Sequence, residues 1–323
     1  MTLNSVKNDT RAIEHFCTLF DSNYLPLGMA LHQSLMTHAL PFHLWIVCMD
    51  EKVEQQLQQL SLPHVSLISL KDVETPALLA VKPERSRGEY CWTLTSFTFQ
   101  AVFERDAHVQ QVTYLDADLF FFADPRLLLQ ELSSDQHVLF TEHAYAPEYD
   151  QAKISGRFCV QFLTFKRTPE AARVMHWWQD RCLEWCFNRV EDGKFGDQRY
   201  LDAWTELFAE DVQIVEQVER TLAPWNVRFF EQRLEGKLQP VFYHFHGLKI
   251  VGSNRIQLYA QYRIGQQGLG LYEDYTTALK AALRQLQAIN ASVPVLPLST
   301  EPKEVLRRVK RWLFQETKFS SIG

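Results

Sequence analysis

Short apolar runs alternate with amphipathic stretches along the first part of the chain. The run at residues 15–20 ends in polar residues, and residues 25–35 then carry apolar side chains at helical spacing, which predicts a strand followed by a helix. Residues 42–49 and 65–70 predict two more strands, separated by a polar helix at residues 51–60. Strands that alternate with helices in this way predict a mainly parallel, twisted sheet flanked by helices.

The alternation continues through the middle of the chain. One helix is predicted at residues 91–105, and an apolar strand at residues 112–115 runs straight into Asp116 and Asp118, which the apolar residues 119–122 follow. Because ligands bind at the carboxyl ends of strands in such sheets, polar residues at strand ends are the first candidates for chemistry. Further strands are predicted at residues 138–141, 160–165 and 241–245, and further helices at residues 171–190 and 200–208.

The end of the chain has a different pattern. Residues 294–302 contain prolines, and residues 303–314 (KEVLRRVKRWLF) interleave basic and apolar side chains, which predicts a basic amphipathic helix. This helix either docks on an anionic membrane surface or packs one face on the rest of the protein. We therefore divide the chain into a main domain, residues 1–290, and a linker with a C-terminal helical appendage, residues 291–323.

Composition narrows the class of protein. A chain of 323 residues with 46% hydrophobic and 22% charged residues is typical of a globular domain, and its net charge of -6 argues against a nucleic-acid partner. The six cysteines include no C-x-x-C pair, so neither a zinc site nor a disulfide framework is predicted. No apolar signal region or membrane-spanning run is present, and we expect a cytoplasmic protein.

Two aspartates directly after a predicted strand are the leading candidates for chemistry. Asp116 and Asp118 lie between apolar segments, where two unpaired negative charges are costly. A divalent cation removes this cost, and carboxylate oxygens suit Mn²⁺ or Mg²⁺. The alternative interpretation is a turn whose aspartates cap only the local backbone.

Two histidines on a later predicted strand are candidate ligands for the same cation. His244 and His246 alternate with aromatic residues, so both imidazoles project from one face, and either could be the ligand. An imidazole added to two carboxylates favours Mn²⁺, whereas packing in the core is the alternative. Gly247 and Lys249 follow, and exposed N–H groups with a lysine suit a diphosphate.

Three motifs in this order carry a family resemblance. The segments YLDAD at residues 114–118, FGDQ at 195–198 and HFHG at 244–247 resemble those of family 8 retaining nucleotide-sugar glycosyltransferases, the group of glycogenin and the lipooligosaccharide galactosyltransferases. The resemblance runs from residue 15 to residue 249. It implies a catalytic α/β domain of the glycosyltransferase A type that moves a hexose from a nucleotide diphosphate donor, of the uridine type, to a saccharide or lipid-linked acceptor with retention. The implied cofactor is Mn²⁺ or Mg²⁺.

The resemblance also assigns roles to individual residues. Asp116, Asp118 and His244 match the metal ligands, and Asp197 and Gln198 match positions on the sugar side of the site, which makes them the candidate catalytic residues. A helix N-cap is the alternative role of Asp197. The implied contacts to the nucleotide sugar are Phe20, Asp21, Tyr24, Arg87, Thr95, Asp116, Ala117, Gly247 and Lys249.

Some positions depart from the family pattern. The family's T-L-T segment corresponds to residues 93–95, and Ser96 stands where a lysine usually follows it, so a phosphate or sugar contact would come from Arg85 or Arg87. The family's F-N-x-G strand reads FCVQ here and ends at Gln161, and Lys249 lies one residue closer to the glycine than usual. These departures indicate a divergent bacterial branch.

Two other classes of protein stay open. A sugar-1-phosphate nucleotidyltransferase also uses an α/β sheet and a metal, but it normally has a glycine-rich basic loop near its N-terminus, which residues 21–28 do not resemble. A non-catalytic nucleotide-sugar-binding protein is compatible with the departures at Ser96 and Gln161. Hydrolysis of a UDP-sugar by the purified protein would favour the enzyme.

Overall fold

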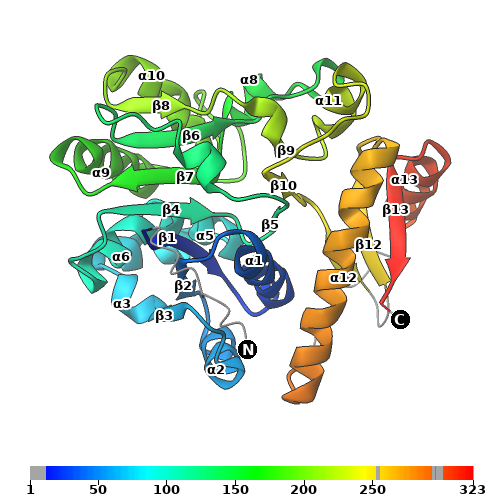
Figure 1. The fold of residues 1–323 in the computed structure, drawn as a ribbon, viewed down its shortest axis with the longest axis horizontal. Coiled ribbons are helices and arrows are strands. Elements are labelled where there is room, and N and C mark those ends of the chain that lie inside the picture. Colours follow the sequence, from blue (N-terminus) through cyan, green and yellow to red (C-terminus); the bar gives the residue numbers. More distant parts are fainter. Residues whose placement is uncertain (1–11, 252–254, 293–294, 296–300, 323) are drawn as a thin grey trace, which may run out of the picture.

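A seven-stranded sheet forms the centre of this computed structural model, which describes residues 12–251, 255–292, 295 and 301–322 (Figure 1). The strand order is β3-β2-β1-β4-β7-β6-β8. These strands are β1 (Glu14–Phe20), β2 (Phe42–Cys48), β3 (Val65–Ser69), β4 (Gln111–Leu115), β6 (Val138–Glu142), β7 (Phe158–Lys166) and β8 (Val212–Ile214).

Parallel pairing dominates this sheet, as the sequence predicts. β1 runs parallel to β2 and β4, β2 to β3, and β6 to β8, whereas β7 is antiparallel to both of its neighbours. The carboxyl ends of β1, β2 and β4 therefore lie at one edge. Because β7 runs the other way, its first half lies beside the end of β4, with Phe162 opposite Leu115. Gln161 is thereby brought next to Asp116.

Helices cover both faces of the sheet. Several begin at a side chain that satisfies free N–H groups: Asp50 accepts from Val53 N at the start of α2, and Ser86 forms a capping box with Glu89 at the start of α5. The α-helices are α1 (Leu25–His38), α2 (Glu51–Leu60), α3 (Leu70–Val73), α4 (Pro76–Val81), α5 (Arg87–Thr95), α6 (Thr98–Arg105), α7 (Arg126–Leu129), α8 (Ala152–Ser155), α9 (Pro169–Glu184), α10 (Trp204–Leu207), α11 (Val227–Arg233), α12 (Gln266–Ala288) and α13 (Pro302–Leu313). Short 3-10 turns cover η1 (Lys82–Glu84), η2 (Pro147–Tyr149), η3 (Gln198–Ala203) and η4 (Val218–Arg220).

The single helix predicted at residues 91–105 is wrong, because the chain forms α5 and α6 with a break between them. At the break the hydroxyl of Ser96 donates to Thr93 O and that of Thr98 donates to Thr95 O. Such bonds from hydroxyl side chains to nearby carbonyls compete with the regular helical pattern. The break places Thr95 at the end of α5.

The helix predicted at residues 171–190 is also too long. α9 ends at Glu184, and Trp185 has an extended backbone whose carbonyl accepts a hydrogen bond from the hydroxyl of Tyr200 at 2.7 Å. Cys182 therefore lies on the helix and Cys186 beyond its end. The helix predicted at residues 200–208 is largely the 3-10 turn η3 followed by the single turn α10.

Two three-stranded sheets complete the fold. One has the order β5-β10-β9 and the other β11-β12-β13. The sequence did not predict α12, β12 or β13. The helix predicted at residues 303–314 is confirmed as α13, whereas most of the predicted linker, residues 294–302, lies outside the described residues. The strands are β5 (Leu119–Phe121), β9 (Thr221–Leu222), β10 (Phe242–His244), β11 (Lys249–Val251), β12 (Arg255–Ala260) and β13 (Thr317–Ser321).

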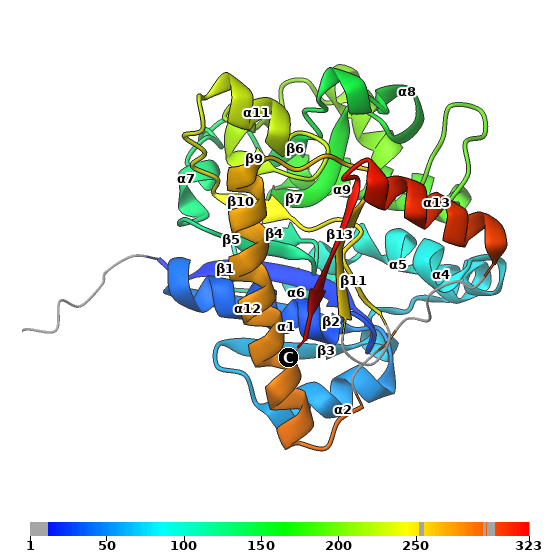
Figure 2. The same ribbon diagram turned by 90° about the vertical axis from the view of Figure 1, so that its right-hand side faces the viewer.

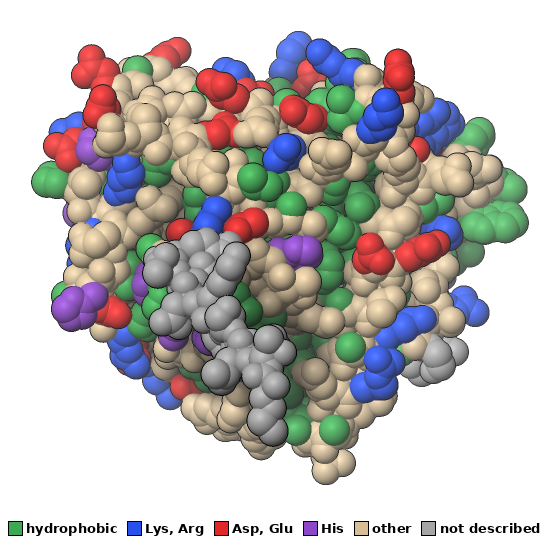
Figure 3. Space-filling view, viewed as in Figure 1, with side chains coloured by type: hydrophobic (Ala, Val, Ile, Leu, Met, Phe, Trp, Pro, Cys, Tyr) green, Lys and Arg blue, Asp and Glu red, His purple; other side chains and the backbone are tan. Residues whose placement is uncertain are grey.

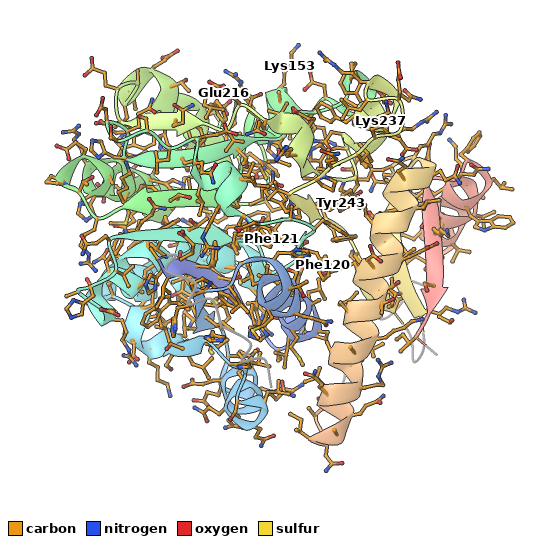
Figure 4. All side chains as sticks on the ribbon, in the orientation of Figure 1. Phe120, Phe121, Lys153, Glu216, Lys237 and Tyr243 are labelled. Carbon is orange, nitrogen blue, oxygen red and sulfur yellow. The ribbon has the colours of Figure 1, made fainter. Side chains whose placement is uncertain are left out.

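The long helix α12 lies along α1 and beside β10 (Figure 2). Aromatic side chains fill the space between β10 and α12: Tyr243 packs edge-on against Tyr272, and Phe245 stacks on Tyr275 with 3.8 Å between ring centroids. Figure 4 shows Tyr243 in the interior near Phe120 and Phe121, which its strand pairs with. Since alternate residues of a strand face opposite ways, the packing of Tyr243 and Phe245 against α12 turns His244 to the other side.

No helix in the part of the chain that the structure describes is long and apolar enough to cross a bilayer.

Candidate active site

Asp116 and Asp118 lie in the turn between β4 and β5, and main-chain hydrogen bonds fix this turn on both sides. Asp116 N donates to Gln161 O at 3.0 Å, and Phe245 N donates to Asp118 O at 2.9 Å. One bond reaches β7 and the other the residue that follows β10. Both carboxylates are therefore positioned by strands on either side of them.

His244 closes a cluster with these carboxylates. Its Nε2 lies 3.1 Å from Asp118 Oδ1 and 3.7 Å from Asp116 Oδ2. His246 joins them, because ligand atoms of Asp118, His244 and His246 all lie within 4.8 Å of one another. We call Asp116, Asp118, His244 and His246 the histidine cluster. The sequence left open which histidine is the ligand, and the structure brings both to the site.

A buried tryptophan holds the two imidazoles in place. Trp225 packs edge-on against His244 and His246, with ring centroids 5.5 and 5.6 Å away, and its indole N–H donates to His143 O at 2.6 Å. Sequence reasoning missed Trp225. The adjacent Asn226 also donates to His143 O, at 3.1 Å, a contact across 83 positions that no local sequence pattern reveals.

Burial and mutual charge shift the titration of this cluster. Burial raises the pKa of Asp116, although His244 opposes the shift. Burial acts on Asp118 in the same direction, but His244 outweighs it and lowers the pKa of that carboxyl. For His244 burial favours the neutral ring, yet Asp118 outweighs it and raises its pKa well above the usual range. The carboxylates thus draw positive charge to this point.

The donor set of the histidine cluster fits a divalent cation. Carboxylate oxygens suit Mg²⁺ and Mn²⁺, and imidazole nitrogens favour Mn²⁺ of the two. Within the described residues, neither Asp116 nor Asp118 forms an ion pair with a lysine or an arginine. The arrangement can therefore accommodate a divalent cation.

Asp197 lies on another side of the same cluster. It is 3% exposed, its Oδ2 has no hydrogen-bond partner among the described residues, and burial together with Asp116 raises its pKa to about 8. Gly196 before it has a φ of +55°, a conformation that favours glycine, and lies over the ring of Trp92. Gln198 follows at the start of η3 and is half-buried. Asp197 is thus a buried carboxyl able to donate a hydrogen bond at neutral pH.

Thr95 and Tyr114 lie between the carboxyls of Asp116 and Asp197. The hydroxyl of Tyr114 donates to Asp116 Oδ1 at 3.0 Å. Thr95 is buried and donates to Cys91 O at 3.2 Å. Ala117, also buried, separates the two aspartates of the turn.

A second acidic group occupies the ends of β1 and β2. Arg87 forms ion pairs with Asp21, where Nε lies 2.6 Å from Oδ2, and with Asp50. The carboxylate of Asp21 also accepts from the main-chain N–H groups of Asn23 and Tyr24 at 2.8 and 3.2 Å. We call Asp21, Asp50 and Arg87 the arginine cluster. It brings together residues that the sequence placed on separate elements.

The two arginines offered as substitutes for a missing lysine differ in place. Arg85 is buried over the ring of Phe187, with its guanidinium carbon 3.8 Å from the centroid, and donates to Leu183 O at 3.2 Å. Arg87 keeps 55% of its side chain exposed. Arg85 therefore supports packing, and Arg87 is the one available to a ligand.

The remaining predicted contacts fall into two groups. Tyr24 is 50% exposed, and Lys249 is exposed on β11. Gly247 has a φ of +78°, so the chain turns there in a conformation that favours glycine. Phe20, by contrast, is buried against Gly28 in the core, so its side chain faces away from solvent.

Sequence reasoning also missed the role of Gln161, which it treated only as a departure from a family motif. The side-chain Oε1 of Gln161 lies 2.7 Å from His244 Nδ1, and the residue is fully buried. The available signal was a polar residue inside an otherwise apolar strand, where a buried amide requires partners.

No protein-family model matches the chain. Two proteins of Bacillus subtilis (strain 168), both named as uncharacterized, are similar in sequence. YfnF is 32% identical over 255 residues, which cover 75% of this chain and 84% of YfnF. YfnD is 30% identical over 289 residues, which cover 85% of this chain and 91% of YfnD.

Three solved structures share the fold. The bifunctional glycosyltransferase WbbM has a TM-score of 0.50 and 15% identity over 89% of this chain, which spans 52% of the length of WbbM. The apo form of glycosyltransferase GlyE of Streptococcus pneumoniae TIGR4 has a TM-score of 0.51 and 12% identity, covering 86% of this chain and 64% of GlyE. The galactosyltransferase LgtC, solved with donor and acceptor sugar analogs, has a TM-score of 0.50 and 13% identity, covering 83% of this chain and 95% of LgtC. The fold is therefore of the glycosyltransferase A type.

Proposed function

This chain belongs to the same protein family as YfnF and YfnD of Bacillus subtilis, and from its glycosyltransferase A-type fold we propose that it is a metal-dependent hexosyltransferase. The donor is a nucleotide diphosphate sugar, of which uridine diphosphate sugars are the first to test. The acceptor is a saccharide or a lipid-linked saccharide. The family 8 retaining glycosyltransferases, which the sequence resembles, serve as the model for this proposed reaction.

The histidine cluster is the observation that carries the proposal. Two carboxylates and two imidazoles converge at the end of β4, and the described part of the chain supplies no lysine or arginine to pair with those carboxylates. Asp116, Asp118, His244 and His246 would hold Mn²⁺ or Mg²⁺. When bound, the cation neutralises charge that develops on the departing nucleoside diphosphate.

Residues around the cluster have proposed roles in holding the donor. Gly247 and Lys249 contact the diphosphate, through an open main chain and a point charge respectively. Asp21 and Tyr24 meet the nucleoside, with Arg87 beside them. Thr95, Ala117 and the main chain near Phe20 complete the donor contacts that the family resemblance implies.

Asp197 and Gln198 are the proposed catalytic residues on the sugar side. The buried carboxyl of Asp197, with its pKa raised to about 8, is able to donate a hydrogen bond to a sugar hydroxyl. Gln198 offers an amide beside it. We propose retention of anomeric configuration, with the acceptor approaching near Gln198, and NMR of the product anomer tests this directly.

A thermal-shift screen of nucleotide sugars with and without Mn²⁺ tests the function. A true donor should raise the melting temperature more in the presence of Mn²⁺ than in EDTA, because a ligand that binds only the folded state stabilises it by mass action. Slow release of free sugar from that donor then shows catalysis. Binding without hydrolysis or transfer would instead indicate a non-catalytic nucleotide-sugar-binding protein.

We extend the proposal to the surface of α13, which would dock on an anionic membrane carrying lipid-linked acceptors. Leu306, Trp312 and Leu313 are 71%, 65% and 65% exposed, and hydrophobic side chains gather over this helix at the right-hand edge of Figure 3. Exposed Lys303 and Lys310 lie on the same helix. An apolar face flanked by basic residues suits an acidic lipid surface. The proposed location is the cytoplasm, peripheral to the inner face of the plasma membrane.

Vesicle flotation tests this docking. The wild-type protein should float with vesicles that contain phosphatidylserine and much less with neutral vesicles. The double substitution Leu306→Ser and Leu313→Ser should abolish flotation. Leu207→Ser changes another exposed leucine, 55% exposed on α10, and should float as the wild type does. Equal flotation of all three proteins would contradict the proposal.

A further inference from the structure

A buried polar chain leads away from the histidine cluster. His244 Nδ1 lies 2.7 Å from Gln161 Oε1, Gln161 Nε2 donates to Thr141 Oγ1 at 3.3 Å, and the hydroxyl of Thr141 donates to Cys159 O at 3.3 Å. Gln161 and Thr141 are both 0% exposed. Both side chains are closed off from bulk solvent, and the hydrogen bonds must agree in direction along the chain.

The direction follows from the end of the chain at Cys159. A backbone carbonyl only accepts, so the one hydroxyl hydrogen of Thr141 is committed to Cys159 O. The oxygen of Thr141 then has to accept, and the NH₂ group of Gln161 is the donor that faces it. The amide oxygen of Gln161 is left to face His244.

The imidazole of His244 is thereby fixed in one arrangement. Because Gln161 Oε1 accepts, Nδ1 of His244 carries a hydrogen. Nε2, which points at Asp118 and Asp116 from 3.1 and 3.7 Å, is then the nitrogen that would offer its lone pair to a cation held by those carboxylates. An amide turned the other way would place the hydrogen on Nε2 and remove that lone pair from the site.

We propose that Gln161 is a positioning residue for the metal site, and that with Thr141 it selects the tautomer of His244 that binds the cation. The inference rests on the proposed metal-dependent function. Hydrogen bonds from the second ring nitrogen of a ligating histidine orient the ring and raise its basicity, and their loss costs roughly 10- to 100-fold in metal affinity. The departure from a glycine-ended family motif at Gln161 thus takes on a function of its own.

Two substitutions of Gln161 separate positioning from simple packing. Gln161→Leu keeps much of the volume and removes the acceptor, so Mn²⁺ affinity measured by calorimetry should fall by roughly 10- to 100-fold. Gln161→Glu keeps an oxygen facing Nδ1, so Mn²⁺ affinity should stay close to that of the wild type. If Gln161 only filled space, both variants should lose Mn²⁺ affinity in proportion to their loss of thermal stability.

Thr141→Val and Gln179→Leu supply the controls. Thr141→Val frees the amide of Gln161 to turn and should weaken Mn²⁺ binding, by less than Gln161→Leu does. Gln179 is a buried glutamine that donates to Ser96 O and Gln100 Oε1, so Gln179→Leu disturbs a comparable amide away from the histidine cluster. Its Mn²⁺ affinity should be unchanged.

Nitrogen NMR of the protein loaded with diamagnetic Mg²⁺ gives a readout that activity does not. The wild type should show Nδ1 of His244 protonated and Nε2 without a hydrogen, and Gln161→Leu should lose this single pattern. Equal Mn²⁺ affinity and the same tautomer in wild type and Gln161→Leu would overturn the inference alone. Failure of the wild type to bind either metal ion would overturn it together with the proposed function.

Discussion

The arginine cluster and the histidine cluster, both at the edge of the sheet, balance the negative charge of their carboxylates in different ways. The arginine cluster pairs its carboxylates with the guanidinium of Arg87, whose side chain is 55% exposed. The histidine cluster pairs its carboxylates with an imidazole that is 6% exposed. A guanidinium stays charged at any ordinary pH, whereas an imidazole can give up its proton. This difference indicates that the arginine cluster is complete by itself and that the histidine cluster is suited to an added cation.

Their surroundings reinforce this contrast. Asp50 of the arginine cluster also caps α2 by accepting from Val53 N at 2.7 Å, so it contributes to the fold without any ligand. Asp116 of the histidine cluster is half-buried, and burial raises its pKa. The contacts therefore distinguish the two carboxylates. Asp50 stabilises the start of a helix, whereas the negative charge of Asp116 is unfavourable in its surroundings unless a cation is bound.

The largest effect is expected when the histidine cluster is broken at Asp118. Asp118→Asn should weaken Mn²⁺ binding by more than about 100-fold and abolish metal-stimulated turnover, since even changes behind a ligand cost up to roughly that factor. Asp50→Asn, the matched change in the arginine cluster, should leave Mn²⁺ affinity unchanged. Calorimetric titration of both variants decides the matter, and full activity of Asp118→Asn in EDTA would refute the assignment.

The two histidines should contribute unequally. His244→Gln removes the nitrogen nearest both carboxylates and should weaken Mn²⁺ binding about as strongly as the loss of a carboxylate ligand. His246 is exposed and lies farther out, so His246→Gln should cost less, about 10-fold. The same titration measures both variants. A larger loss for His246→Gln would reverse their proposed order.

Breaking the arginine cluster at Arg87 should change ligand binding rather than metal binding. Arg87→Ala should weaken binding of a uridine diphosphate compound by about 10-fold, the loss expected for one charge-assisted contact, with Mn²⁺ affinity as in the wild type. Its effect on the melting temperature should be small, because Asp21 keeps hydrogen bonds from the main-chain N–H groups of Asn23 and Tyr24. Lys71, which forms an exposed ion pair with Glu51 on the surface, provides the control Lys71→Ala. Equal nucleotide binding by Arg87→Ala and the wild type would exclude Arg87 from the site.

The smallest effect is the contribution of Asp50 to stability. Partial burial would raise the pKa of Asp50, but hydrogen bonds from Val53 N and Ser22 and the charge of Arg87 hold it below the usual value. A carboxyl with a depressed folded-state pKa stabilises the fold above its unfolded value of about 3.9, and the benefit is lost as pH falls through the folded value. Asp50→Ala should cost about 1 kcal/mol at pH 7 as a lost helix cap, and less at pH 3. Urea unfolding at the two pH values measures this, and a cost that does not depend on pH would contradict it.

Much of the sheet and the acidic turn could be predicted from the sequence, for a physical reason. Strands buried on both faces leave long apolar runs, and Asp116 and Asp118 interrupt such a run where local sequence alone marks a strand end. The ends of helices were predicted less well. Whether the chain breaks near Ser96 or stops at Glu184 depends on hydroxyl bonds and on a contact with Tyr200 that no local pattern records.

Contacts between distant parts of the chain were the least predictable features. Gln161 and His244 are 83 positions apart, and their contact depends on β7 running antiparallel beside β4. The strands β12 and β13 pair across a long stretch of sequence, from Arg255 opposite Ser321 to Ala260 opposite Thr317. The sequence could name most candidate residues, but only the fold shows which of them meet.

A manganese titration of the wild-type protein and of Asp118→Asn, followed by the electron paramagnetic resonance of free Mn²⁺, tests the central claim most directly. The wild-type chain should bind one Mn²⁺ at the histidine cluster and so reduce the signal of free Mn²⁺. The Asp118→Asn variant should leave that signal unchanged over the same range of Mn²⁺ concentrations. Wild-type and variant curves that coincide would show that this cluster is not the metal site.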